Sequence, residues 1–154
     1  MKVLLSLVLL GMSLAVAAQD QSAEKEAIKK TISILFDGMR KGDSTLLKTA
    51  FDKKAVFHSI SASAAGETKL VSGETLQDFA KAIGTPHPDV WDERVSIEEI
   101  KINGNLASVW APYKFYRGDK FSHCGIDSFQ LMKTTAGWKI IYVVDTRLKD
   151  NCPE

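Results

Sequence analysis

The hydrophobic pattern early in the chain predicts two helices. Between residues 27 and 40, apolar side chains recur at the spacing i, i+4, i+7, i+8 and i+11, which places them on one helical face. The following segment, residues 44–50, predicts a short second helix with Leu46 and Leu47 turned inward, and Asp43 is its expected N-cap. The apolar stripe of the first helix comprises Ile28, Ile32, Leu35, Phe36 and Met39.

A third helix is predicted over residues 74–83. Gly84 and Pro86 follow it and stop a helix, while Ser72 is the expected cap before its first turn. Its apolar stripe comprises Leu76, Phe79, Ala80 and Ile83.

The remaining segments have the β-branched and aromatic residues, and in part the alternation, that are typical of strands. Asn103-Gly104 and Gly137 mark tight turns between strands. Because proline cannot donate to a strand ladder, Pro112 marks a bulge, a bend or an edge position. The expected strands are residues 55–60, 67–71, 95–102, 106–116, 121–133 and 138–147.

This order of elements indicates a single domain of the α+β class. Two helices come first, then two short strands, one helix and a long antiparallel meander, so we expect the helices to cover one face of a strongly bent sheet. The bend encloses a cavity between sheet and helices, which is the expected ligand site. The chain of 154 residues is long enough for one such domain with a buried core.

The first twenty residues have the layout of a secretory signal peptide. Lys2 precedes an apolar run, residues 3–14, and small residues follow at positions 15–18. A membrane anchor is the alternative, but the run is short for a span and has no basic residues after it. We expect cleavage near Ala17 or Ala18, which leaves a mature domain of residues 19–154 with no membrane span.

Charge and histidine content disfavour two kinds of partner. Lys and Arg number 20 against 19 Asp and Glu, and no basic run is present, so nucleic-acid binding is not expected. The three histidines lack the close spacing of metal ligands, so neither a metal site nor another cofactor is expected.

Cys124 and Cys152 are the only cysteines. An antiparallel hairpin would bring the C-terminal tail back toward Cys124, so a disulfide is possible in an oxidising compartment. The alternative is a buried free thiol at position 124 beside a frayed terminus.

The helix pair, the third helix and the meander that closes on Gly-Trp-Lys-Ile at residues 137–140 resemble the nuclear transport factor 2-like superfamily. This superfamily includes the SnoaL-like polyketide cyclases and the ketosteroid isomerases. The run VWAPYKFYRGDKFSHCGIDSFQLMKTTAGWKI resembles, more narrowly, the putative lumazine-binding proteins, many of which are exported by bacteria. The resemblance implies a cone-shaped, cystatin-like fold, a largely apolar pocket, a homodimer formed through the outer sheet face, and a periplasmic or secreted location.

Three polar residues are expected on the concave face of the sheet. Alternate residues of a strand share a face, and a three-residue loop at positions 135–137 would place Asp127 opposite Asp145, with His123 and Arg147 nearby. A shift of one residue would move Asp145 to the other face. The residues expected to share the face of Asp127 are Phe121, His123, Gly125, Phe129 and Leu131.

His123, Asp127 and Asp145 are therefore candidate acid–base groups. Isomerases of the superfamily that this chain resembles use an Asp base with Tyr or protonated Asp donors. The alternative is structural: Arg147 pairs with Asp145, and His123 bonds a neighbouring strand or Asp127. The candidate ligand-binding residues are His58, Trp110, Tyr113, Phe115, Phe121, Phe129 and Arg147, each of which could instead belong to the core or the rim.

Three functions are compatible with these observations. The first is binding of a small apolar or aromatic molecule outside the cytoplasm. The second is an isomerase or hydrolase in which His123 acts with Asp127 or Asp145. The third is a dimeric interaction module whose cavity is filled by side chains, which a structure with no ligand-sized cavity would favour.

Overall fold

The computed structural model describes residues 2–62 and 66–153, with side chains from residue 21 onward. The predicted signal peptide, residues 1–18, lies outside the residues whose side chains are described. Within the described part of the chain, no helix is long and apolar enough to cross a membrane.

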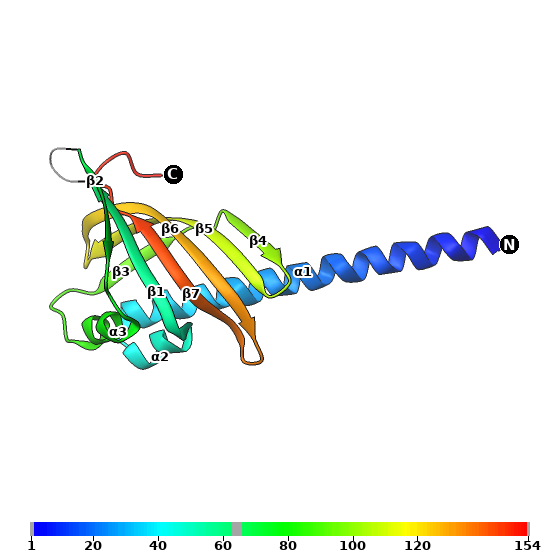
Figure 1. The fold of residues 1–154 in the computed structure, drawn as a ribbon, viewed down its shortest axis with the longest axis horizontal. Helices are drawn as coiled ribbons and strands as arrows, with labels where there is room; N and C mark the ends of the chain where they lie inside the picture. Colours follow the sequence, from blue (N-terminus) through cyan, green and yellow to red (C-terminus); the bar gives the residue numbers. More distant parts are fainter. Residues whose placement is uncertain (1, 63–65, 154) are drawn as a thin grey trace.

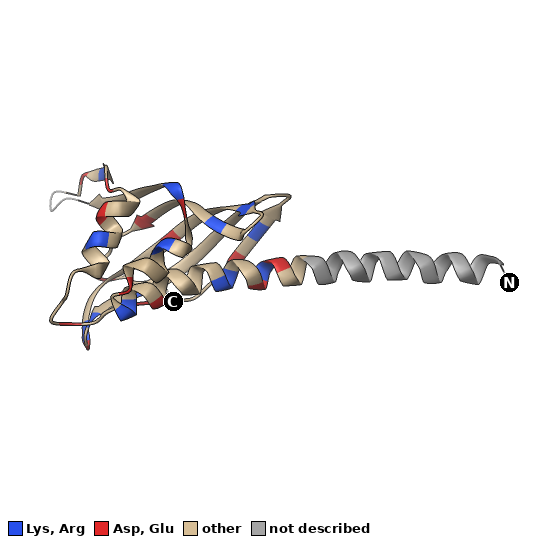
Figure 2. Ribbon diagram, turned by 90° about the horizontal axis from the view of Figure 1, so that it is seen from below, with Lys and Arg blue, Asp and Glu red and all other residues tan. Residues whose placement is uncertain are grey.

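In the described part of the chain, three helices lie on one side of a curved sheet (Figure 1). Helix α1 spans Lys2–Lys41, α2 spans Ser44–Thr49 and α3 spans Leu76–Gly84. The predicted stripe of α1 is buried as expected, from Ile28 to Met39. Acidic and basic residues are interspersed along the described part of α1 rather than separated by sign (Figure 2).

The helix caps agree with the sequence at α2 and differ at α3. Asp43 accepts hydrogen bonds from the backbone amides of Thr45 and Leu46, as its position predicts. The cap of α3 is Thr75, not Ser72, and it forms a capping box with Asp78. The prediction of Ser72 was wrong because the helix begins two residues later than expected, and Asp78 then lies at the position that a capping box requires.

Among the described residues, seven strands form one sheet in the order β2-β1-β7-β6-β5-β3, with β4 also paired to β5. All pairs are antiparallel except β1 with β7, which is parallel and departs from the antiparallel sheet that was predicted. Helices α2 and α3 precede and follow the β1–β2 hairpin, so β1 is not the direct hairpin partner of any meander strand. The strands are β1 Phe51–Ala62, β2 Thr68–Ser72, β3 Trp91–Val95, β4 Glu99–Asn103, β5 Leu106–Arg117, β6 Lys120–Thr134 and β7 Gly137–Thr146.

Pro112 explains the break between β3 and β4, which leaves only the last residues of the strand predicted over residues 95–102 in β4 and Val95 in β3. The register changes by one residue between Val95 opposite Tyr113 and Glu99 opposite Trp110. At this change the carbonyl of Pro112 accepts a hydrogen bond from the amide of Ser96 at 2.9 Å. Because proline has no amide proton to return the bond, the partner strand bulges there.

The pairing of Asp127 with Asp145 is observed, but the route to it differs from the prediction. The turn between β6 and β7 has Thr134 opposite Gly137, one residue shorter than the expected loop. A bulge after Gln130 then shifts the register by one residue and restores the predicted pair. Both carboxylates therefore lie on the concave face.

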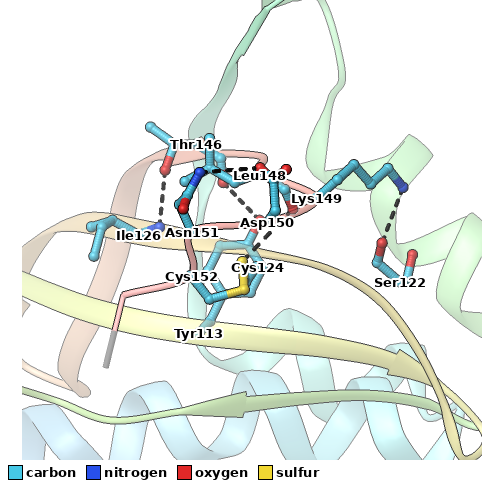
Figure 3. Close-up of a disulfide and its surroundings, with 10 residues drawn as sticks. All are labelled: Tyr113, Ser122, Cys124, Ile126, Thr146, Leu148, Lys149, Asp150, Asn151 and Cys152. Carbon is cyan, nitrogen blue, oxygen red and sulfur yellow. Dashed lines mark hydrogen bonds between the residues drawn. A yellow bond between two sulfur atoms is a disulfide. The ribbon is translucent and has the colours of Figure 1, made fainter.

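The C-terminal tail is fastened to β6 by a disulfide between Cys124 and Cys152 (Figure 3). Backbone hydrogen bonds between Cys124 and Leu148 hold the same segment. Cys124 is fully buried, so the open question of its pairing resolves to a covalent link rather than a free thiol.

Candidate functional site

A pocket of about 330 Å³ lies between the concave face of the sheet and the helices. Its apolar wall comprises Leu35, Phe36, Met39, Phe51, Phe57, Phe79, Ala82, Trp91, Phe115, Phe129 and Val143. Its polar lining comprises His58, Ser59, Glu74, Glu93, Arg117, His123, Asp127, Asp145 and Arg147.

Two carboxyl groups meet at the polar end of this pocket. Asp127 on β6 is only 4% exposed, and its Oδ2 atom accepts no hydrogen bond from the described residues. The side chain of Glu93, on β3, is its hydrogen-bonding neighbour. Because two carboxylates cannot both be ionised cheaply at such a position, the pair shares a proton.

Burial is the main cause of the raised pKa values of this pair. It raises the pKa of Glu93 to about 7, with the charge of Asp145 acting in the same direction. Burial also raises the pKa of Asp127 well above its ordinary value, and the neighbouring charge of Glu93 raises it further. One of the two carboxyls is therefore protonated at neutral pH.

Asp145 has partners of its own. The guanidinium Nε of Arg147 donates to Asp145 Oδ2 at 2.8 Å, which is the structural pairing that the sequence left open. The hydroxyl of Tyr113 lies 3.5 Å from the same oxygen and donates to the carbonyl of Thr146 at 2.8 Å. Burial raises the pKa of Tyr113, so this hydroxyl stays protonated and acts as a donor.

Gly125 allows the end of β7 to approach β6 this closely. A Cβ atom at this position would overlap the carbonyl oxygen of Thr146. The hydroxyl of Thr146 in turn accepts a hydrogen bond from the amide of Ile126 at 3.0 Å (Figure 3). Because glycine has no Cβ atom, position 125 lets the end of β7 place Asp145 and Arg147 beside Asp127.

His123 lines the pocket but makes no hydrogen bond to either aspartate. Its Nδ1 atom lies 3.1 Å from the hydroxyl of Ser122, and its ring packs against Phe115 and Tyr113 at centroid distances of 5.0 and 5.7 Å. Burial and then the positive charge of Arg147 lower the pKa of His123. The imidazole is therefore neutral at pH 7.

Some of the predicted ligand-binding residues line the pocket and others lie outside it. Phe115, Phe129 and Arg147 line the pocket, whereas Tyr113 is 2% exposed and lies outside the pocket lining. Trp110 is 47% exposed on the convex face, because its neighbours Val109 and Ala111 face the core. The prediction that Trp110 contributes to the pocket was wrong.

Phe121 also lies outside the pocket. A register shift between β5 and β6 leaves Ser122 with no residue opposite it in β5. Phe121 therefore lies opposite Tyr116, and its side chain is not on the concave face. The centroids of the two rings are 5.9 Å apart, and the side chain of Phe121 is 44% exposed. The assignment of Phe121 to the face of Asp127 was therefore wrong.

The imidazole of His58 points away from the pocket, although this residue is part of the rim. His58 is paired with Val144, and its neighbour Phe57 with Val143 on the concave face. Its Nδ1 atom lies 2.9 Å from the hydroxyl of Tyr142. His58 and Tyr142 thus satisfy each other on the convex face.

Glu93 is the functional residue that sequence reasoning missed. It lies in β3, which was not predicted because its five residues follow the Pro-rich loop and are mostly polar. The alternation of Trp91, Glu93 and Val95 was the available signal, because these three residues share one face of a strand. Glu74, at the rim before α3, was also missed; burial raises its pKa.

The lining of the pocket is mostly apolar, with a few polar groups. Within the residues that the structure describes, no three His, Cys, Asp or Glu side chains are grouped so as to hold a metal. The pocket instead combines an aromatic wall with a few converging polar groups, as is typical of small-molecule sites.

The fold is that of nuclear transport factor 2-like proteins. One solved structure, a nuclear transport factor 2-like protein of unknown function from Shewanella baltica, is 24% identical with a TM-score of 0.65, and the match covers 84% of this chain and 97% of that one. Another, a nuclear transport factor 2-like protein with a cystatin-like fold from Novosphingobium aromaticivorans, is 13% identical with a TM-score of 0.70, covering 89% and 90%. These similarities establish the fold.

The family is narrower than the fold. Residues 23–144 match the family described as putative lumazine-binding, so the protein belongs to that family. No curated protein matches the chain.

Proposed function

We propose that this protein binds a small apolar or aromatic molecule in the pocket beneath the curved sheet. The observation that carries the proposal is a cavity of about 330 Å³ whose wall is mainly aromatic and aliphatic and whose polar groups converge at one end. This volume lies at the lower end of the range for ligand sites. It also argues against the interaction module with a filled cavity.

Fluorescence titration with N-phenylnaphthylamine, a neutral apolar probe, tests the proposal. We expect saturable binding of one probe per chain. Ser59→Trp places a large ring at the pocket lining and should weaken binding about tenfold or more. Ser96→Trp is the matched control, because Ser96 is exposed and does not line the pocket. Equal probe affinity in both variants would contradict the proposal.

We further infer that the protein is exported and forms a homodimer. Residues 1–18 support export through their signal-peptide layout. Val56, Ile60 and Trp110 support dimerisation, because they are exposed apolar side chains on the convex face of the sheet. Export is tested by the N-terminal sequence of the protein recovered from its own bacterium, and the dimer by sedimentation of the wild type against Trp110→Lys.

A second candidate function, acid–base catalysis, is favoured by the buried carboxyl pair. With a pKa of about 7, Glu93 can accept or donate a proton at neutral pH, and Asp127 lies beside it. The sequence assigned this role to His123 with Asp127 or Asp145, whereas the geometry favours Glu93 with Asp127.

Isomerisation of a β,γ-cyclohexenone to its conjugated form, followed by absorbance, tests catalysis. Asp127→Asn should lower the rate by about a hundredfold if the pair transfers the proton, while circular dichroism checks that the variant is folded. A wild-type rate no greater than that of buffer would exclude this reaction.

A further inference from the structure

The unpartnered oxygen of Asp127 is the feature of the pocket that its own residues do not explain. Oδ2 is buried, takes part in no ion pair and accepts from no amide, hydroxyl or cationic group of the described residues, so the pair has only the proton that it shares between Asp127 and Glu93. A buried acceptor without a donor destabilises the folded protein. A donor supplied by a bound molecule would remove that destabilisation.

The carboxyl pair has no ion-pair partner of its own among the described residues, although the charge of Arg147 acts on both of its members. Arg147 is already bonded to Asp145, and Arg117, the other arginine of the lining, is an exposed residue at the end of β5. No described lysine or arginine forms a salt bridge with Asp127 or with Glu93, its neighbour. The polar end of the pocket is therefore short of positive charge.

Aromatic rings complete the surroundings of the carboxyl pair. Trp91 is two residues before Glu93 on β3 and meets Phe115 edge to face at 6.1 Å. Phe129 is two residues after Asp127 on β6 and meets Phe36 in the same manner at 6.3 Å. Ring faces attract organic cations, and the attraction strengthens where water is excluded.

We propose that the pocket selects an organic cation, a protonated amine carried on an aromatic or apolar body, with the ammonium group donating to Asp127 and Glu93. This inference rests on the proposed binding function and specifies its ligand class. The ammonium group would replace the one proton that the two carboxyls share with three N–H donors, so that Asp127 Oδ2 would be bonded as well, and the apolar body would lie against the aromatic wall.

Replacement of that proton makes binding depend on pH. Since burial raises the pKa of Glu93 to about 7 and the pKa of Asp127 well above its ordinary value, protons compete with the amine, and its affinity should rise by about tenfold or more per pH unit as the pH rises toward about 7 and continue to rise above it. His123 is neutral in this range because its pKa is lowered. The other titratable or charged groups that face the pair are Tyr113 and Arg117 on β5, Asp145 and Arg147 at the end of β7, and Glu74 before α3.

Displacement of N-phenylnaphthylamine by three matched compounds tests the inference. Naphthylethylamine is cationic, naphthylethanol is neutral and naphthylacetate is anionic, while their apolar bodies are the same. We expect the amine to bind the disulfide-bonded wild type at least about tenfold more tightly than the alcohol, and the acid to bind most weakly.

The variants Glu93→Gln and Asp127→Asn keep the shape of the pair, and each removes one of its two carboxyl groups. Each should lower the affinity for the amine about tenfold or more while the affinity for the alcohol changes little. Glu98→Gln is the matched control, because Glu98 is exposed and lies outside the pocket, and it should leave the amine affinity unchanged. Probe affinity and circular dichroism report whether each variant is folded.

The outcomes separate this inference from the function on which it rests. If the probe binds but the alcohol or the acid equals the amine, the cation inference is overturned and pocket binding stands. An amine preference that survives in the double variant of Glu93 and Asp127 would also overturn it. If neither the probe nor any of the three compounds binds, both proposals fail.

Discussion

The polar groups on the two faces of β6 differ in their hydrogen bonding. On the convex face, Gln130 donates to the hydroxyl of Ser108 at 3.2 Å, and Cys124 is joined to Cys152. On the concave face, Asp127 is buried with an oxygen that has no donor in the described chain. These convex-face groups are thus paired within the protein, whereas one buried oxygen of the concave face accepts no hydrogen bond from the described residues, which calls for an explanation such as a bound ligand.

The largest effect that separates the two faces is expected for two phenylalanines of the same strand. Phe129→Ala removes a fully buried ring that packs against Phe36 and should lower the free energy of unfolding by about 3–5 kcal/mol. Phe121→Ala, its control, removes a ring that is 44% exposed and should cost less than about 2 kcal/mol. Urea denaturation measures both. Similar losses would show that the concave face does not hold the core.

The disulfide is expected to stabilise the convex side without shaping the pocket. Replacing both Cys124 and Cys152 by Ala should lower the free energy of unfolding by about 2–4 kcal/mol, because the unfolded chain regains freedom. The affinity for N-phenylnaphthylamine should stay within about twofold of the wild type at a temperature where the variant is folded. A large loss of affinity at that temperature would mean that the tail controls the pocket.

The carboxyl pair should make the concave face sensitive to pH. The folded-state pKa values of Glu93 and Asp127 are raised, so the native protein holds protons that the unfolded chain has released. The wild type should therefore be most stable at or below about pH 4.5, as far as this pair is concerned, and lose stability as the pH rises toward about 7 and beyond.

Asp127→Asn removes one of these carboxyls, and its advantage should appear only at the higher pH. We expect the variant to be more stable than the wild type by about 1–3 kcal/mol at pH 8, and close to it at pH 5. Asp119→Asn, at an exposed turn, is the control and should differ little from the wild type at either pH. Urea denaturation at the two pH values measures the difference. A constant difference between Asp127→Asn and the wild type would mean that the carboxyl is not desolvated.

Periodicity predicted the helices well because each one buries a single stripe. All five residues of the α1 stripe are buried, and Leu76, Ala80 and Ile83 of α3 are buried as well. The error at the cap of α3 arose because Ser72 and Thr75 have similar side chains. Only the start of the helix, which tertiary packing decides, distinguishes them.

The candidate site was predicted only in part because strand faces depend on bulges. Asp127, Asp145 and His123 line the pocket as expected. Asp127 lies opposite Asp145, however, only because the shorter turn between β6 and β7 and the bulge after Gln130 shift the register in opposite directions. The bulge at Ser122 moved Phe121 off the same face. A single extra residue moves every later side chain of the strand to the opposite face of the sheet. Alternation along one strand does not reveal where that residue lies.

The sequence by itself determined the α+β class, the buried helix stripes and the presence of carboxylates on the long strands, because these depend on local spacing. Tertiary structure alone decided that Glu93 meets Asp127. Their strands are separated by β5, and the contact arises from the curvature of the whole sheet. The shared proton and the raised pKa values follow from that contact and from burial, which no local pattern encodes.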